Sequence, residues 1–295
     1  MARRSKSDTF DGLQTSPFQG EEISGRSQYQ PERASASRPR RRRSDYWIKF
    51  LGTAGARFVM IRQLRASGGL WLRAGEVNVL VDPGPGSLVR CASSRPKLDP
   101  GTLNAVILTH RHLDHSNDIN VMAEAMTEGG FKKRGVVFLP SDALGADSVI
   151  LKYARDFVGK IEILEANSTY QVGDFSFQTS GLLRHPCQTY GLKFKMKDTS
   201  VSLLADTEYF EGLEDHFKSD VLILNVVFLE PRPGIQHLSF SDAKKIISIL
   251  KPKKTILTHF GLTMLKARPH VLAKTLSWET GLLVVAATDG MTVGF

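Results

Sequence analysis

The segment Thr109–His115, which reads THRHLDH, constrains this chain more than any other stretch. It places three imidazoles and one carboxylate within six residues, directly after the apolar run Ala105–Leu108. An imidazole offers a nitrogen lone pair and a carboxylate offers a hard oxygen, a combination that suits zinc, iron or manganese. An ordinary polar loop is the alternative. The segment predicts a metal site.

The residues around this motif predict how it is held. The run 105–108 has the character of a short strand, and apolar positions spaced along 119–126 predict a helix that ends at Gly129-Gly130. In an extended segment, residues i and i+2 point to the same side. His110 and His112 can therefore share one ion, while Asp114 and His115 turn toward a second.

Other apolar runs along the chain also stop at a single polar side chain. Those at 182–184, 201–205 and 254–258 are followed by His185, Asp206 and His259, and the run 77–81 is followed by Asp82 and then Pro83-Gly84. Each has an ordinary alternative, since a lone histidine can be a surface or core residue and an Asp-Thr pair can cap a helix. Together they can complete two ion sites, with one carboxylate bridging both ions.

The remaining patterns predict an α/β fold. Strands are expected at 47–51, 69–73, 136–139, 161–164, 169–172, 175–178 and 221–225, helices at about 148–158 and 241–250, and closing strands within 278–295. The chain has two halves, each of which mixes strands and helices and has polar groups at strand ends. This pattern favours a four-layered αββα sandwich of two mixed β-sheets flanked by helices.

The net charge of +9 is unevenly distributed. Residues 1–44 contain ten basic and five acidic side chains and carry +5, which leaves +4 for residues 45–295. We expect a disordered basic tail over 1–44 and a folded domain over 45–295. The run Arg38–Arg43 could contact nucleic acid or be a solvated arm.

Cys91 and Cys187 are too few for a disulfide framework, so we expect reduced thiols. The N-terminal residues lack the apolar run of a signal peptide, and no stretch approaches 18 consecutive apolar residues. We expect a soluble, cytoplasmic protein that does not bind membranes.

The order of these residues, HxHxDH followed by His, Asp and His, resembles the metallo-β-lactamase-fold hydrolase superfamily over residues 46–295. The resemblance implies that His110, His112 and His185 hold one ion and that Asp114, His115 and His259 hold the other. It also implies that Asp206 bridges the ions and that Asp82 steadies the motif loop by accepting hydrogen bonds.

The segments Phe50–Ala56, Leu80–Gly86 and Gln236–Ser239 look like the branch that contains ribonuclease Z and the phosphonate-pathway cyclic phosphodiesterases. In that branch a further histidine before the last ligand takes part in catalysis, and His237 matches it by position, although it can equally be a loop histidine. The sequence has no long Gly/Pro-rich insertion resembling the tRNA-clamping arm of ribonuclease Z. A smaller phosphodiester is therefore as plausible a substrate as tRNA.

These features predict a dinuclear metal-dependent hydrolase, a phosphodiesterase or nuclease that attacks with a metal-bridging hydroxide and uses Asp114 and His237 in catalysis. The expected cofactors are two divalent ions, Zn²⁺ first and Mn²⁺ or Fe as alternatives. The expected substrate is a small cyclic or linear phosphodiester or RNA. The protein could also form a homodimer. One alternative is a glyoxalase II-like thioester or ester hydrolase; another is a nucleic-acid-binding protein without catalysis.

Overall fold

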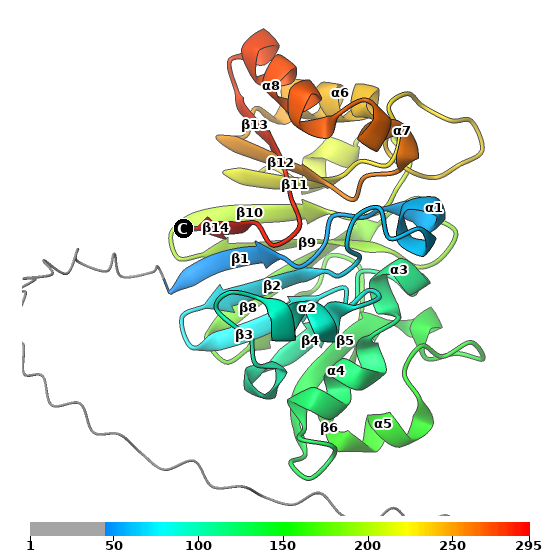
Figure 1. Cartoon of the computed structure of the whole chain (residues 1–295), viewed down its shortest axis with the longest axis vertical. Coiled ribbons are helices and arrows are strands. Elements are labelled where there is room, and N and C mark those ends of the chain that lie inside the picture. Colours follow the sequence, from blue (N-terminus) through cyan, green and yellow to red (C-terminus); the bar gives the residue numbers. More distant parts are fainter. Residues whose placement is uncertain (1–44) are drawn as a thin grey trace, which may run out of the picture. The chain divides into compact units, whose positions relative to one another are not determined.

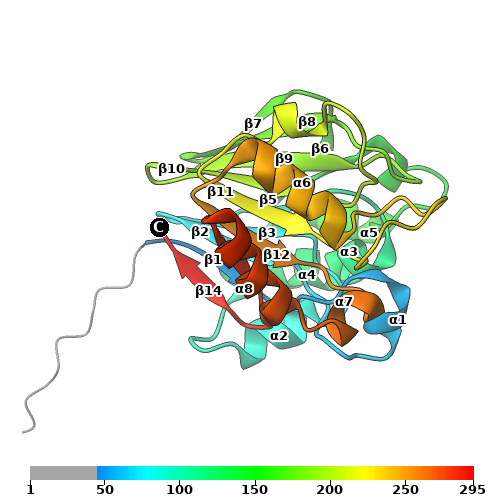
Figure 2. The ribbon, with the colours of Figure 1, turned by 90° about the horizontal axis from the view of Figure 1, so that it is seen from above.

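Two β-sheets pack face to face between two layers of helices (Figures 1 and 2). The computed structural model describes residues 45–295, so the prediction of a disordered tail lies outside the described residues. Each sheet has seven strands with both parallel and antiparallel pairs. The predicted four-layered α/β sandwich is confirmed.

The first sheet contains, in spatial order, β14 (Thr292–Gly294), β1 (Tyr46–Phe50), β2 (Leu70–Ala74), β3 (Val77–Val81), β4 (Ala105–Ile107), β5 (Arg134–Pro140) and β6 (Val158–Leu164). Strands β14 to β3 pair antiparallel, and β3 to β6 pair parallel. The carboxyl ends of β3 and β4 therefore lie at the same edge.

The second sheet contains, in spatial order, β13 (Leu283–Ala286), β12 (Lys254–Thr258), β11 (Val221–Asn225), β10 (Thr199–Leu204), β9 (Tyr190–Met196), β8 (Phe175–Leu182) and β7 (Thr169–Val172). Strands β13 to β10 pair parallel, and β10 to β7 pair antiparallel. Two antiparallel steps make β8 run in the same direction as β10.

The helices are α1 (Ala56–Ile61), α2 (Ser87–Ser93), α3 (Leu113–Ser116), α4 (Ile119–Met126), α5 (Lys152–Phe157), α6 (Phe240–Leu250), α7 (Leu262–Lys266) and α8 (Pro269–Thr280). Three single turns of 3-10 helix span Pro100–Thr102, Ser141–Ala143 and Leu213–His216. Helices α2, α4 and α5 cover the first sheet, and α6 and α8 cover the second (Figure 1). None of the helices in residues 45–295 is both long and apolar enough to cross a membrane.

Strand β3 shows how the sequence produces this layering. Val77, Val79 and Val81 pack in the core between the sheets, whereas Leu80 packs in the core under the helices. Successive side chains of a strand point to opposite faces, so a strand buried on both faces is apolar throughout. Full burial of each such side chain stabilises the fold by about 1.5–3 kcal/mol.

The C-terminal segment differs from its prediction. Helix α8 extends to Thr280, so Trp278 lies in a helix rather than in a closing strand. The helix begins with Pro269 at its first position and ends at Gly281, which has a left-handed conformation. Trp278 is 86% exposed. The predicted closing strands form further along the chain, as β13 and β14.

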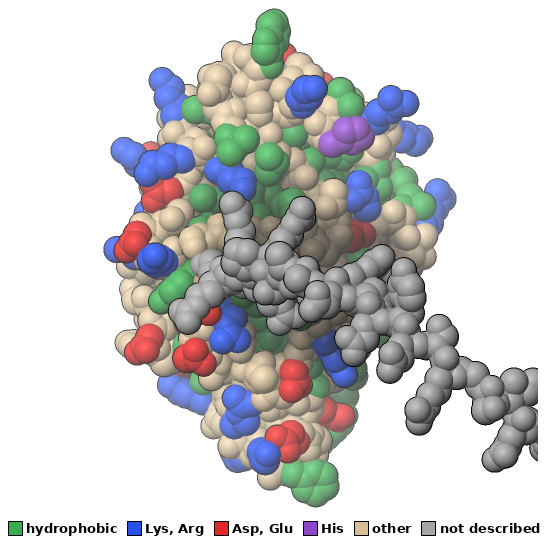
Figure 3. All heavy atoms as spheres, turned by 60° about the vertical axis from the view of Figure 1, so that its left-hand side comes forward, with side chains coloured by type: hydrophobic (Ala, Val, Ile, Leu, Met, Phe, Trp, Pro, Cys, Tyr) green, Lys and Arg blue, Asp and Glu red, His purple; other side chains and the backbone are tan. Residues whose placement is uncertain are grey.

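On the face shown in Figure 3, Lys and Arg side chains are mixed with Asp and Glu side chains and do not form one large patch. This distribution agrees with the small net charge of +4 that residues 45–295 carry.

Candidate metal centre

The predicted ligands meet where the two sheets share an edge. The structure brings together His110, His112, Asp114, His115, His185, Asp206, His237 and His259, with donor atoms in overlapping groups whose members lie within 4.8 Å of one another. Most of them follow the carboxyl ends of β4, β8, β10 and β12. Since these strands run toward the same edge, residues far apart in the sequence become neighbours.

The histidine motif changes conformation in its middle. His112 is extended, with φ −61° and ψ 149°, and is the residue that precedes the single turn of α3. His110 and His112 therefore lie on extended backbone, whereas Asp114 and His115 lie on a helical turn. His110 and His112 share one donor group, and Asp114 and His115 share another, although His110 and His115 also meet in a third group with Asp206.

Asp82 holds the motif at two points. One carboxylate oxygen accepts from the Thr109 amide at 2.7 Å, and the other accepts from the Thr109 hydroxyl at 2.8 Å and from His115 Nδ1 at 2.9 Å. Asp82 has φ 55°, a left-handed conformation that costs energy for a residue with a side chain. Because Nδ1 of His115 donates to Asp82, Nε2 is directed toward the site.

His110 contains a buried nitrogen atom without a hydrogen-bond partner. Its Nδ1 lies 3.1 Å from the Thr109 hydroxyl, which already donates to Asp82 and therefore accepts here. Its Nε2 has no partner, although the residue is 0% exposed. Leaving a buried polar atom unpaired costs about 1–3 kcal/mol, and a bound cation would remove this cost.

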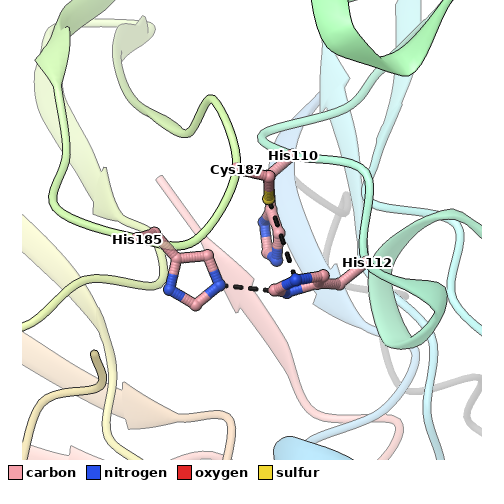
Figure 4. A group of neighbouring side chains, drawn as sticks. All are labelled: His110, His112, His185 and Cys187. Atoms are coloured by element: carbon pink, nitrogen blue, oxygen red, sulfur yellow. Dashed lines mark hydrogen bonds between the residues drawn. The ribbon is translucent and has the colours of Figure 1, made fainter. Parts of the chain in front are cut away.

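His185 and His112 face each other through ring nitrogens. His185 donates from Nδ1 to the carbonyl of Gln236 at 2.9 Å, and its Nε2 lies 3.0 Å from His112 Nδ1 (Figure 4). Cys187 lies beside them, with Sγ 3.9 Å from His112 Nε2. The prediction from sequence gave Cys187 no role beyond a reduced thiol, although its place two residues after His185 was a usable signal.

Asp206 occupies the centre of the cluster. Its Oδ2 lies 3.1 Å from His259 Nε2 and 3.5 Å from His115 Nε2, and its Oδ1 accepts from Asn225 at 2.8 Å. His259 Nε2 is also 3.3 Å from His115 Nε2 and 3.7 Å from Asp114 Oδ2. A central carboxylate among separate imidazole groups is what a ligand bridging two ions requires.

His237 points toward the same carboxylate from the loop between β11 and α6. Its Nδ1 lies 3.5 Å from Asp206 Oδ2 and is buried without a hydrogen-bond partner. The preceding residue, Gln236, supplies the carbonyl that orients His185. The loop thus positions one imidazole at the centre and fixes the tautomer of another.

Burial has the largest influence on the imidazoles and lowers the pKa of four of them, His110, His112, His185 and His259. The pKa of His185 falls to about 4. These rings are neutral at physiological pH and keep a lone pair for a cation.

Two residues of the cluster are charged. Burial opposes the charged form of His115, but three carboxylates outweigh it and raise its pKa well above the ordinary value. Burial likewise opposes ionisation of Asp206, but His259, His115 and His237 hold its pKa well below the usual range. The four neutral imidazoles and the ionised carboxylate have the protonation states that metal ligands need, whereas His115 would release its proton when a cation bound there. With that exchange these residues fit a divalent ion.

Two glycines allow the backbone to approach the ligands. A Cβ atom on Gly55 would lie 2.1 Å from the carbonyl oxygen of His259, and one on Gly84 would lie 2.1 Å from that of Asp114. Any side chain at either position would displace a ligand residue. Glycine at positions 55 and 84 is thus a requirement of the site.

The sequence matches the model of the β-lactamase superfamily domain over residues 77–260. An uncharacterised protein of Methanocaldococcus jannaschii is 31% identical over 256 residues, which cover 83% of this chain and 94% of that protein. YhfI of Bacillus subtilis is 25% identical over 198 residues, which cover 66% of this chain and 80% of YhfI.

Solved structures share the fold. The crystal structure of YhfI, a metallo-β-lactamase fold protein, superposes with a TM-score of 0.69 at 20% identity, covering 85% of this chain and 99% of that one. A diphosphatase from the PhnP family gives 0.66 at 17% identity, with 85% and 97% covered. The short form of human tRNase Z gives 0.62 at 17% identity, with 84% and 98% covered. The chain therefore belongs to the metallo-β-lactamase-fold hydrolases, a superfamily that includes ribonuclease Z-like members.

Proposed function

We propose that this protein is a dinuclear metal-dependent phosphodiesterase. One donor set would consist of His110, His112 and His185 and the other of Asp114, His115 and His259, with Asp206 shared between them. Two bound divalent ions would supply an activated water nucleophile and would neutralise charge on the phosphate oxygens. Nitrogen and oxygen donors favour Zn²⁺ as the resident ion, with Mn²⁺ or Fe as alternatives.

The position of His237 favours a phosphodiester over a thioester as the substrate. Its unpartnered Nδ1 faces the centre at 3.5 Å from Asp206 Oδ2. The alkoxide that leaves a phosphodiester is strongly basic and needs a proton, whereas the thiolate that leaves a thioester does not. An imidazole at the centre can supply that proton, which favours a phosphodiester over the substrate of a glyoxalase II-like enzyme.

Basic side chains near the centre support an anionic substrate. Helix α1 begins just after Gly55, whose amide donates to the carbonyl of Phe260, next to the ligand His259. Arg57 and Arg62 are exposed there, and neither forms an ion pair with a described residue. Unpaired positive charge beside a cationic centre attracts phosphates.

A substrate comparison tests the proposal. The zinc-reconstituted protein should hydrolyse bis-p-nitrophenyl phosphate and should leave S-lactoylglutathione intact. The variants His112→Ala and Asp206→Ala should lose both turnover and bound metal, because each removes a ligand. Thioester turnover without phosphodiester turnover would overturn the proposal, as would full activity with normal metal content in either variant.

A further inference from the structure

Cys187 is a free thiol at the centre to which the proposed function assigns no role. It lies in the loop between β8 and β9 and is half-buried. Its sulfur lies 3.9 Å from His112 Nε2 and 3.9 Å from the hydroxyl of Thr189, and the backbone of Arg111 also hydrogen-bonds to it. These polar neighbours place the sulfur in a site for a charged or polar ligand rather than in an apolar pocket.

The sulfur belongs to a set of converging donors. One donor atom from each of His110, His112, His185 and Cys187 lies within 4.8 Å of the others. Figure 4 shows the sulfur next to the three rings, and Pro186 joins Cys187 directly to the ligand His185. His110 Nε2, which is buried and unpartnered, belongs to this set. An unpartnered buried nitrogen and a thiol therefore converge in one donor set.

Charge distinguishes this set from its neighbour. The other set contains a carboxylate of its own, Asp114, beside His115 and His259. The set near Cys187 otherwise consists of three imidazoles and has no carboxylate of its own. The carboxylate of Asp206 borders it, with Oδ2 3.9 Å from His110 Nε2. A divalent ion held by three neutral rings is better balanced with a second anionic ligand.

We propose that Cys187 is a further protein ligand, through its sulfur, of the ion that His110, His112 and His185 hold together with the shared Asp206. When the ion binds, the S–H bond breaks, an S–metal bond forms and the proton passes to solvent, with no change of oxidation state. This inference rests on the two-metal centre of the proposed function. Because thiolate is a soft ligand, it would favour zinc over manganese at this position.

Cobalt substitution tests the ligand directly. Metal-depleted protein titrated with Co²⁺ should develop an intense sulfur-to-cobalt charge-transfer band in the near ultraviolet. Cys187→Ser should lose this band and keep the weaker visible bands of the imidazole and carboxylate ligands. Cys91→Ala is the matched control, since Cys91 is the other thiol and lies buried on α2 outside the donor set; it should keep the band.

Metal affinity gives a second readout. In competition with a chelator, Cys187→Ser should bind one of its two zinc ions more weakly, by more than the roughly 10–100-fold that loss of an outer hydrogen-bond partner costs. Its manganese affinity should change less. Cys187→Asp should restore an anionic ligand and shift the preference toward manganese.

Several results would overturn the inference: no sulfur band in the wild-type protein, a band that persists in Cys187→Ser, or an unchanged zinc affinity in that variant. Wild-type protein that binds two ions and hydrolyses bis-p-nitrophenyl phosphate without a sulfur band would refute the ligand and support the proposed function. A sulfur band in protein that hydrolyses no phosphodiester would support the ligand and refute that function.

Discussion

Asp82 acts on the metal centre without being placed to bind an ion itself. It accepts hydrogen bonds from both groups of Thr109 and from His115, and so sets the position of one motif residue and the ring orientation of another. A strand end followed by Pro83-Gly84 predicts an aspartate near the rim. The sequence cannot show which groups donate to it, because the donors lie about thirty residues away on another strand.

Asp82→Asn should lower zinc affinity about 10–100-fold, the usual cost of removing an outer partner of a metal ligand. The amide group of asparagine would place an N–H against a donor of Thr109 or His115. Chelator competition measures the loss. Asp99→Asn is the control, because Asp99 also accepts a backbone amide, that of Gly101, but lies before β4 at the opposite edge. Equal losses in both variants would contradict the specific role of Asp82.

His237→Ala should separate proton donation from metal binding. If His237 protonates the leaving oxygen, its loss should slow hydrolysis of an alkyl phosphodiester by about 10²–10⁴-fold. Hydrolysis of bis-p-nitrophenyl phosphate should fall much less, because p-nitrophenolate leaves without a proton. Metal content should stay normal. Because His237, His185 and Asp206 also form a donor group, a loss of bound metal would make His237 a ligand instead.

The residues that meet at the centre could be predicted from sequence because they lie in one His/Asp motif or follow an apolar run and have a suitable side chain. Cys187 follows the candidate ligand His185 by two residues, but its closeness to His110 and His112 depends on how the two sheets pack. Likewise, the orienting carbonyl of Gln236 comes from the backbone, and any residue type can supply one. The sequence shows which side chains could bind a metal ion. It does not show which contacts the backbone groups make.

The elements that the sequence reveals best are those buried on both faces. Strands β3, β11 and β12 occupy the predicted residues, because a short segment rich in Val, Ile and Leu that ends at a polar residue or a turn leaves few alternatives. Helices α1 and α2 were not predicted. Val59 is the buried residue of α1, and α2 buries Ser87 and Cys91, so neither shows an apolar periodicity that a sequence can reveal.

Helix α2 contributes a pH-dependent stability through Cys91. Burial, together with the carboxylate of Asp118, raises the pKa of this thiol to about 12 from 9.0. The unfolded chain therefore ionises first, so stability is complete below pH 9 and declines as pH rises toward 12. Over this range the thiol should account for a loss of at most about 4 kcal/mol.

Urea unfolding of wild-type protein and Cys91→Ala from pH 8 to 11 measures this contribution, with chelator present to remove the effect of bound metal. The difference in unfolding free energy between the two proteins should shrink as pH rises above 9. Parallel curves over the whole range would show that Cys91 ionises equally in the folded and unfolded states.

At the scale of the whole molecule, the site exists because two sheets are packed with their functional edges together. His110 to His115 belong to the first sheet, and His185, Asp206 and His259 belong to the second. The sequence predicts mixed sheets and helical layers, since apolar runs and amphipathic helices are local properties. The order of the strands and the way in which the two sheets pack against each other are set by long-range pairings such as β1 with β14. No local sequence pattern encodes these pairings.

The arrangement also places positive charge on one side of the centre. Helix α1 contacts α3, which carries two of the predicted ligands, and lies beside α3 and α7 in both ribbon views (Figures 1 and 2). Arg57 and Arg62 should therefore attract an anionic substrate before it reaches the ions. Arg57→Ala/Arg62→Ala should raise KM for bis-p-nitrophenyl phosphate roughly two- to thirtyfold and leave kcat unchanged, since each exposed charge contributes about 0.2–1 kcal/mol.

The salt dependence of kcat/KM distinguishes electrostatic attraction of the substrate from a structural effect of the substitutions. Exposed charges are screened over about 10 Å at 0.1 M ionic strength, so the double variant should show a shallower fall of kcat/KM with added salt than the wild-type protein. Lys133→Ala/Lys197→Ala removes the same charge from residues that precede β5 and β10, at the edge opposite the centre, and should keep the wild-type salt dependence. If both variants respond alike, the net charge of the molecule attracts the substrate and α1 has no special part. If only the α1 variant responds, the substrate approaches over α1, and its anionic group is oriented before it meets the donors at the sheet edge.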